Sequence, residues 1–368
     1  MKKNFNRRFV FIIILTIIFG YSFIGTKGEV VENLEIPIAV GYDLSESGEY
    51  RVPIPIYEFS PSGDIKSKTI TGQSSSIGGT RDDRQRKANK RYLLGVEKLY
   101  VISEKYAEYG IRNIIDILLN NPQVSDRNPT VVFKGKAEDL FKYKIQGYAN
   151  SAEYIEGMIK NSRYYNFFSG QFNMMDLIVR VDAEGRNPVL PYVELKEDGP
   201  EITGLAIFRG DKMIGKTNMQ EARAINLLKF SGGKGILSIQ KDPKHYVNFY
   251  AQSKRKVKCY KTDGKYNFLI NLDLNGNIAS NELDPSILKD PKALKKFTSD
   301  MENLVKKMCT EYINKANYEY KTDIFGLGRV AVAKYGRQTG IDWNKTVSES
   351  IIEVKVKVTV KDEGRGTY

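Results

Sequence analysis

The chain is 368 residues long, carries a formal net charge of +13 at pH 7, and contains 41% hydrophobic and 27% charged residues. This balance excludes an intrinsically disordered chain, and the length allows several domains with cores of their own. Because the positive charges are spread along the whole chain, they favour a solvated surface or an anionic lipid surface over a nucleic acid partner.

The first predicted element is an apolar run from Phe9 to Ile24, which is typical of a membrane-associated helix. Basic residues precede the run: Lys2, Lys3, Arg7 and Arg8. The run is shorter than the roughly 20 apolar residues that span a bilayer without strain, so crossing requires local thinning of the bilayer. The cations indicate a cytoplasmic N-terminus and an external chain after the run. Residues 1–25 are therefore predicted to be a signal-like or transmembrane anchor, with cleavage left open.

The next block alternates strands and helices. Apolar runs at 34–44 and 50–59 are joined by a glycine-containing turn, so they predict a strand pair. Residues 60–90 are rich in serine, glycine and charge, and we expect part of this stretch to be a mobile loop. Short strands are expected at 99–102 and 130–135, each followed by a helical period. This alternation predicts an α/β or α+β domain.

The middle of the chain contains a hairpin and a helix. Residues 204–215 predict a hairpin turned at Gly210 and Asp211, and the apolar period over 218–230 predicts a helix. The segment Ser231–Gly235 is rich in glycine, but a helix precedes it and a strand follows. A phosphate-binding loop requires the reverse order, so we predict a simple helix-to-strand turn.

The last third combines long strands with one long helix. Strands on either side of Asp263 and Gly264 predict a second hairpin. Asp290 followed by Pro291 marks a helix start, and the apolar positions from Leu294 to Tyr312 share one helical face.

A closing strand with two different faces ends this part. Apolar residues at Ile352, Val354, Val356, Val358 and Val360 alternate with Glu353, Lys355, Lys357, Thr359 and Lys361. This alternation predicts one buried face and one solvated, basic face.

The residues offer no recognisable catalytic centre. His245 is the single histidine, and no serine or cysteine nucleophile motif accompanies it. Cys259 and Cys309 lie on apolar faces and are expected to be small core residues, with a bridge between them left open. Asp82 and Asp83 are the most conspicuous pair of carboxylates, but their polar surroundings indicate a solvated face. Two carboxylates from distant parts of the chain could still meet in the fold and hydrolyse a glycoside, and this alternative stays open. We expect a binding or assembly protein and not an enzyme, without catalytic, cofactor-binding or metal-binding residues and without a cofactor.

Several stretches, taken together and in order, resemble the C subunit of spore germinant receptors, the Ger(x)C family. The stretches are Glu32–Leu44, Tyr92–Pro122, Gly204–Gly215, Thr322–Arg329 and the closing strand downstream of Trp343. The residues that carry the resemblance are Gly41, Asp43, Gly95, Gly110, Asp323, Phe325 and Gly326. We predict them as family-motif residues and candidate interface residues. The alternative for each is a structural role at a turn, a helix cap or a core position.

The resemblance implies an α+β fold of three mixed α/β domains, each a β-sheet packed with helices, after the N-terminal membrane-anchor helix. We expect an N-terminal domain at 26–200, a small middle domain at 201–243 and a C-terminal domain at 244–368. The resemblance further implies a non-enzymatic subunit that spore germination requires. It would lie on the outer face of the spore inner membrane beside integral membrane A and B subunits. We expect the anionic membrane surface as a further partner and no nucleic acid partner.

One departure from the family concerns the anchor. Family members usually carry a lipid-modified cysteine after the signal, whereas this chain has Gly25 or Thr26 at that point. Thioether lipidation needs a cysteine thiol, and neither Gly25 nor Thr26 has one. We therefore predict that the apolar helix is retained as the anchor. The alternative function is an extracellular solute-binding protein that binds a small-molecule germinant directly in an aromatic pocket.

Overall fold

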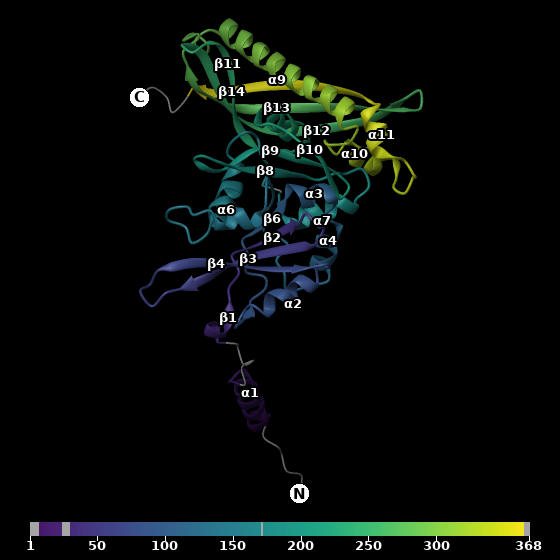
Figure 1. Cartoon of the computed structure of the whole chain (residues 1–368). Helices are drawn as coiled ribbons and strands as arrows, with labels where there is room; N and C mark the ends of the chain where they lie inside the picture. The colour runs from purple at the N-terminus through teal and green to yellow at the C-terminus, as the bar shows by residue number, and fades with distance from the viewer. Residues whose placement is uncertain (1–6, 24–29, 171, 364–368) are drawn as a thin grey trace.

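The computed structural model describes residues 7–23, 30–170 and 172–363 of the chain. Two large β-sheets packed with helices form an elongated body, which confirms the predicted α+β fold class (Figure 1). At the lower end of the body in Figure 1, a short 3-10 helix (Val31–Asn33) leads into β1 (Leu34–Glu35), which pairs in parallel with β5 (Arg91–Tyr92).

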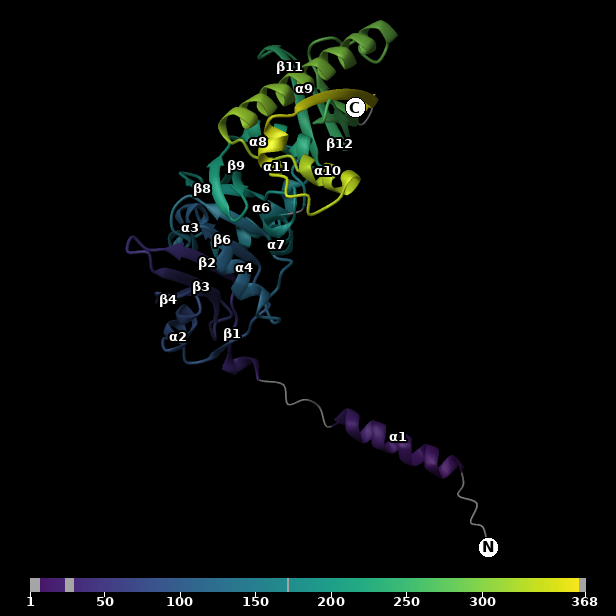
Figure 2. The same cartoon turned by 90° about the vertical axis from the view of Figure 1, so that its right-hand side faces the viewer.

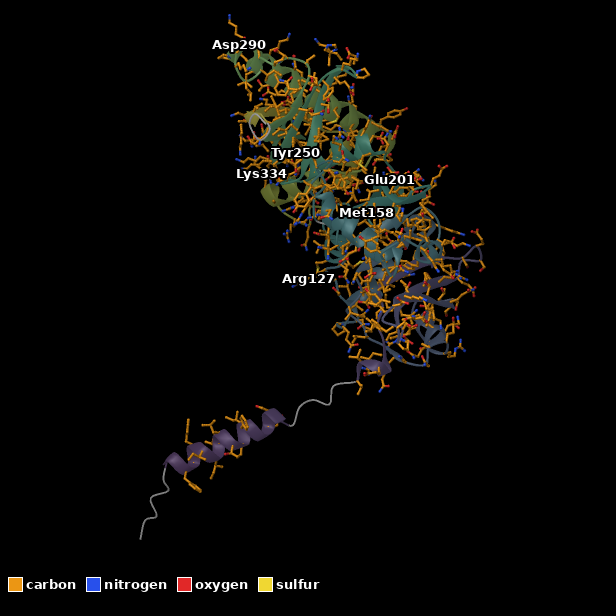
Figure 3. All side chains as sticks on the ribbon, turned by 90° about the vertical axis from the view of Figure 1, so that its left-hand side faces the viewer. Arg127, Met158, Glu201, Tyr250, Asp290 and Lys334 are labelled. Carbon is orange, nitrogen blue, oxygen red and sulfur yellow. The ribbon has the colours of Figure 1, made fainter. Side chains whose placement is uncertain are left out.

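The predicted N-terminal apolar helix is present as α1 (Arg7–Phe23) (Figure 2). Its large apolar side chains are exposed, for example Phe9 at 62%, Phe11 at 65% and Ile17 at 63%, and they project on all sides of the helix (Figure 3). Within the described ranges, no helix is both long enough and apolar enough to cross a bilayer. Gly25 and Thr26, where the lipid-modified cysteine was expected to be replaced, lie outside the described residues.

Eight strands form the larger sheet. They are β2 (Ala39–Leu44), β3 (Tyr50–Phe59), β4 (Ile65–Ser74), β6 (Leu99–Ser103), β7 (Thr130–Phe133), β8 (Val189–Lys196), β9 (Gly199–Arg209) and β10 (Lys212–Lys216). The order is β10-β9-β8-β7-β6-β2-β3-β4, with a parallel centre from β8 to β2 and an antiparallel pair at each edge. β6 and β7 are buried at every position, because parallel strands in such a sheet are covered on both faces.

Helices cover both faces of the larger sheet. The helices are α2 (Gly79–Gln85), α3 (Glu104–Tyr109), α4 (Arg112–Leu119), α5 (Ala137–Lys142), α6 (Ser151–Ser162), α7 (Met174–Asp182) and α8 (Met219–Lys229). Residues of α3, α4 and α7 share one core with Tyr42 and Tyr100 of the sheet. Residues of α5, α6 and α8 share a second core with Val101 and Leu205, and this core continues into the smaller sheet. The two sheets therefore belong to one continuous packed body.

The smaller sheet has four strands and one long helix. Its elements are β11 (Lys234–Asp242), β12 (His245–Thr262), β13 (Lys265–Asn281), β14 (Ile351–Glu363), α9 (Pro291–Glu319), α10 (Leu327–Tyr335) and α11 (Trp343–Ser348). The strand order is β11-β12-β13-β14, and β14 runs parallel to β13. A parallel neighbour requires a crossover connection, and α9 to α11 provide it. α9 packs on the inner face through Phe297, whose ring meets that of Phe249 at 6.1 Å.

The predicted hairpins, helix start and closing strand are confirmed. β9 and β10 turn at Gly210 and Asp211, and β12 and β13 turn at Asp263 and Gly264, which both have positive φ. The side chain of Asp290 accepts a hydrogen bond from the backbone N–H of Lys292 and caps α9. From 351 to 361 in β14 the even positions are buried or half-buried, whereas the odd positions are exposed.

Residues 60–90, part of which was expected to be a mobile loop, contain a strand and a helix that were not expected, β4 and α2. β4 pairs with β3 over its full length, from Phe59 opposite Ile65 to Tyr50 opposite Ser74. α2 packs closely on β4, since a Cβ on Gly72 would lie 2.0 Å from the carbonyl oxygen of Thr80. A backbone ladder at a sheet edge needs few apolar side chains, and this explains why the low hydrophobicity was misleading.

Residues 201–243, expected as a small middle domain, contribute to both sheets. β9 and β10 extend the larger sheet, β11 forms an edge of the smaller sheet, and α8 connects them. The three domain boundaries remain predictions, and the segment links the two halves of the body.

Candidate functional site

Gly41 allows β2 and α5 to approach each other closely. A Cβ on Gly41 would lie 2.7 Å from Ala137 Cβ, 2.7 Å from Pro53 Cγ and 2.8 Å from Phe141 Cε2. A larger residue would push the helix away from the sheet, since packed cores have no free volume for it. Gly41 is thus a packing position in the interior of the fold.

Asp43 holds the start of the same helix. Its carboxylate is 1% exposed and accepts hydrogen bonds from the backbone N–H groups of Ala137 at 2.7 Å and Glu138 at 3.2 Å. Burial raises the pKa of Asp43 to about 6, against the lowering effect of the two backbone hydrogen bonds. The carboxylate therefore satisfies N–H groups at a helix N-terminus from a neighbouring strand.

Gly95 and Gly110 occupy turns that require positive φ. Gly95 has φ +89°, and a Cβ there would lie 2.3 Å from the carbonyl oxygen of Gln123. Gly110 follows α3 with φ +129°, and the next N–H, of Ile111, donates to the carbonyl of Asp211 at 2.9 Å. Gly110 therefore brings the α3–α4 corner against the β9–β10 hairpin.

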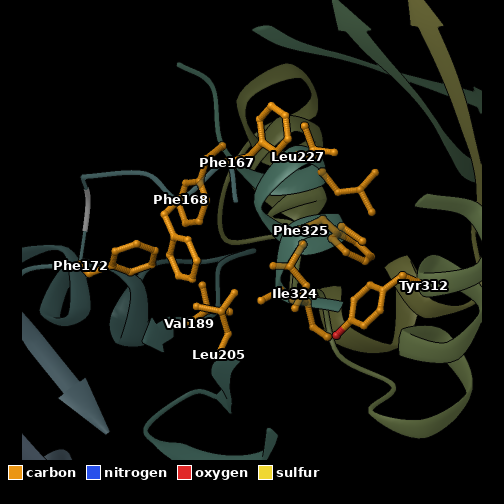
Figure 4. Packing of buried hydrophobic residues seen from close by; sticks show 14 of the residues in the cluster. Phe167, Phe168, Phe172, Val189, Leu205, Leu227, Tyr312, Ile324 and Phe325 are labelled. Carbon is orange, nitrogen blue, oxygen red and sulfur yellow. The ribbon is translucent and has the colours of Figure 1, made fainter. Parts of the chain in front are cut away.

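Asp323, Phe325 and Gly326 lie together at the start of α10. The carboxylate of Asp323 is buried and accepts hydrogen bonds from the N–H groups of Leu327 at 2.9 Å and Gly328 at 2.7 Å. Gly326, with φ +69°, turns the chain into the helix. The ring of Phe325 meets that of Tyr312 at 6.2 Å, close to Ile324 (Figure 4). Asp323 and Phe325 are buried in the fold, whereas Gly326 is half-buried and has open space beside it.

Polar side chains from distant parts of the chain gather around Asp323. We call this cluster the seam, and it consists of Asn187, Lys229, Arg255, Asp323 and Asn344. Asn187 donates to the carbonyl of Asp323 at 3.2 Å and to Oδ1 of Asn344 at 2.6 Å, and it accepts from the N–H of Gly210 at 2.9 Å. The seam thus connects the larger sheet to the elements that follow α9.

Two cations complete the seam. Lys229 Nζ donates to the carbonyls of Asn187 at 3.0 Å and Ile324 at 2.5 Å, and burial holds the pKa of Lys229 well below its usual range. Arg255 donates to the carbonyl of Phe325 at 3.1 Å, and burial lowers the pKa of Arg255 to about 10. Burial also raises the pKa of Asp323. Sequence reasoning missed Lys229 and Arg255, because nothing in a single strand or helix marks which lysine or arginine points inward.

The described residues contain no group of three or more His, Cys, Asp or Glu side chains that could hold a metal ion. His245 lies at the exposed β11–β12 turn, where Nδ1 is 2.8 Å from Asp242 Oδ2. Cys259 and Cys309 are both buried and free, which resolves the open question of a bridge between them in this structure. The burial of each thiol raises its pKa. This arrangement suits packing more than nucleophilic chemistry.

One shallow aromatic hollow lies on the surface between the tip of the β3–β4 hairpin and the start of α6. Its lining includes Tyr57, Phe59, Ile65 and Tyr148, with Glu153 at its base. The rings of Tyr57 and Phe59 stack at 5.9 Å. Glu153 accepts from Tyr57 Oη at 2.5 Å and pairs with Lys98 Nζ at 2.8 Å. Sequence reasoning did not locate this hollow, because its sides come from segments far apart in the chain.

Comparison with known proteins gives consistent results over most of the chain. Residues 27–195 match the family described as "Spore germination protein N-terminal domain", and residues 203–364 match "Spore germination B3/ GerAC like, C-terminal". Spore germination protein GerQC of Bacillus cereus is 23% identical over 95% of this chain and 98% of its own length. Spore germination protein YndF of Bacillus subtilis (strain 168) is 22% identical over 73% of this chain and 67% of its own length. The crystal structure of the GerBC protein, 16% identical, superposes with a TM-score of 0.53 over 87% of this chain and 96% of that chain, and this likeness concerns the fold alone.

Proposed function

The chain belongs to the Ger(x)C family of spore germination proteins, the family of germinant-receptor C subunits, and we propose that it is a non-enzymatic, membrane-anchored subunit of such a receptor. The observation that carries the proposal is the ordered match of an N-terminal and a C-terminal family region to the two halves of one body. The predicted motif residues hold helices and turns in place, as expected for residues that maintain the shape of such a body.

The proposed role depends on attachment of the chain to the membrane. The family is associated with the spore membrane, and we assign the attachment of this chain to α1, whose apolar side chains are exposed. We place the body on the outer face of the spore inner membrane and the N-terminus in the cytoplasm. Confinement to a surface raises the effective concentration of the body near its partners, so a weak interface is largely occupied.

We propose the integral membrane A and B subunits of the receptor as protein partners, and the anionic membrane surface as a further contact. Without Lys2, Lys3, Arg7 and Arg8 of the N-terminus, the net charge of +13 falls to +9, and this remaining positive charge favours that surface. Nucleic acid is not part of the proposal.

A pull-down from detergent-solubilised membranes tests the subunit assignment. A tagged full chain is expected to retain polytopic membrane proteins, whereas a variant without residues 7–23 is expected to leave the membrane fraction and to retain less of them. Recovery of the full chain alone from the membrane fraction, under conditions where other receptor complexes stay intact, contradicts the assignment.

The aromatic hollow favours a second candidate, an extracellular protein that binds a small-molecule germinant directly. The stacked rings of Tyr57 and Phe59 beside the Glu153–Lys98 pair would hold an apolar side chain next to charged groups. This candidate predicts a saturable thermal shift of the full chain with amino acids, and loss of the shift in Phe59→Ala. A shift of the same size in Phe59→Ala, or none in the parent chain, removes the hollow from consideration.

A further inference from the structure

The outer face of the smaller sheet carries two rows of lysines. We call it the lysine face, and its lysines are Lys254, Lys256 and Lys258 on β12, and Lys355, Lys357 and Lys361 on β14. All six side chains are exposed, and none has an ion-pair partner among the residues that the structure describes. The face is therefore a free, positively charged surface.

Strand register aligns the two rows. Lys256 and Lys355 both lie opposite Asn271 of β13, and Lys254 and Lys357 both lie opposite Asp273. Neighbouring lysines in a row are roughly 7 Å apart, and the rows are about 10 Å apart across β13. Like charges this close together give the face a positive electrostatic potential, which a layer of external anions would neutralise.

Acidic residues within these rows neutralise only a part of the charge. Asp273 lies between the rows, and Glu353 lies at the start of β14 beside Leu269. The inner face of the same strands is apolar and packs on α9, so no helix of the described chain covers the lysines.

The composition of the lysine face indicates which kind of partner binds it. Protein interfaces are depleted in lysine at their centres and depend on aromatic or arginine anchors in pockets. The rows hold no arginine, and Tyr260, which follows Lys258 on the same face, is exposed. A second copy of this chain carries the same net charge of +13 and is repelled. Lysine is a strongly hydrated point charge that suits diffuse attraction to a layer of anionic headgroups. Such a layer is within reach because of α1.

We propose that the lysine face rests on anionic phospholipid headgroups and forms a second membrane contact of the body. This inference rests on the proposed membrane attachment through α1. β1, where the described body begins, and the smaller sheet lie at opposite ends of the molecule (Figure 1). With α1 attached at one end and the lysine face at the other, the long axis of the body lies parallel to the membrane. The two contacts together determine which side of the body faces its partners.

Energy transfer from the sheet to the lipid tests the proposal. The full chain with Thr359→Cys on the lysine face carries a donor dye, since Cys259 and Cys309 are buried. It is reconstituted in phosphatidylcholine vesicles with or without about one third phosphatidylglycerol, with an acceptor dye on the headgroups. Transfer is expected on the anionic vesicles and is expected to fall when salt is raised from about 0.1 M to about 1 M, where the Debye length shrinks from about 10 Å to about 3 Å.

Reversing the charge of four lysines tests whether the lysine face is the surface that contacts the lipid. Lys254, Lys256, Lys355 and Lys357 changed together to Glu are expected to weaken docking on anionic vesicles at least about 100-fold. The matched control changes Lys292, Lys295, Lys296 and Lys306, which are exposed on α9, and is expected to keep the transfer.

Three outcomes decide between this inference, the proposed attachment and a protein contact. A labelled chain that floats with vesicles but transfers equally on neutral and anionic lipid, or loses transfer equally in the α9 control, overturns the lysine-face contact and leaves attachment intact. A chain that does not float with vesicles at all contradicts the attachment itself. Protection of the lysines from acylation only when polytopic partners are present assigns the face to a protein and overturns the lipid contact.

Discussion

Two buried aspartates perform the same task in the two family regions of the chain. Asp43 and Asp323 each accept hydrogen bonds from two backbone N–H groups in the first turn of a helix. Asp43 reaches α5 from a strand that lies far away in the chain, whereas Asp323 lies just before α10. Each carboxylate replaces water that the helix N-terminus would otherwise bind. The structural alternative considered for these motif residues therefore accounts for their geometry, and a role in an interface stays a prediction.

Gly41 tests close packing at the residue scale. We expect Gly41→Ala to lower the free energy of unfolding by about 1–3 kcal/mol, because the added Cβ meets Ala137 and Pro53 at 2.7 Å. Gly157→Ala in α6 is the control, since a Cβ there meets nothing within 4 Å and alanine favours the helix by up to about 1 kcal/mol. Urea unfolding of both variants measures the difference, and equal stability of the two would refute the packing argument.

Asp43 also predicts a pH dependence. Its pKa is about 6 when folded, against 3.8 for the free group, so the folded state binds more protons between these values. Stability from this group is then present below about pH 4 and is lost as pH rises through about 6, by roughly 3 kcal/mol in total. In Asp43→Asn this component is expected to vanish. Denaturant unfolding between pH 4 and 7 checks it, and parallel pH profiles of the two proteins contradict it.

At the scale of elements, local signals and long-range pairing contribute differently. The Asp-Gly turn at 263–264, the Asp-Pro start of α9 and the alternation of β14 follow from neighbouring residues, and they were predicted. β4 was missed, because an edge strand derives its stability from the ladder to β3 and from α2 above it. Its own composition resembles a loop.

The cap of α9 gives a prediction at this scale. Asp290→Ala is expected to lower the free energy of unfolding by about 0.5–2 kcal/mol, because the N–H of Lys292 loses its side-chain acceptor. Asp300→Ala, on the exposed side of the same helix, is expected to change it by less than about 0.5 kcal/mol. Thermal unfolding of the two variants compares them. A larger effect at position 300 would show that helix charge, and not the cap, matters.

At the scale of the whole molecule, the seam determines how the two halves are joined. Asn187 lies before β8 and Asn344 lies in α11, yet their side chains meet at 2.6 Å. Both also contact the main chain of Asp323. Because buried polar groups that lose a partner are destabilising, the seam favours one relative arrangement of the two sheets.

A double-mutant cycle tests this coupling. Asn187→Ala and Asn344→Ala are expected to show an interaction energy of about 0.5–3 kcal/mol in urea unfolding, since each variant removes the same contact. Asn187→Ala combined with Asp290→Ala serves as the control and is expected to be additive within about 0.5 kcal/mol. Additivity in the first pair would mean that the two amides act independently.

The sequence alone determined the features that depend on near neighbours: the apolar N-terminal helix, the helix starts, the tight turns, the two-faced closing strand and the family resemblance. The resemblance depends on several motifs in order along the chain, and the other features follow from charge, period and turn chemistry within a few residues. Tertiary structure alone decided which strands pair, that β14 runs parallel to β13, and which of many lysines are buried at the seam or aligned on the lysine face. The reason is physical, because register and burial depend on contacts between residues far apart in the chain, and one sequence does not state those contacts.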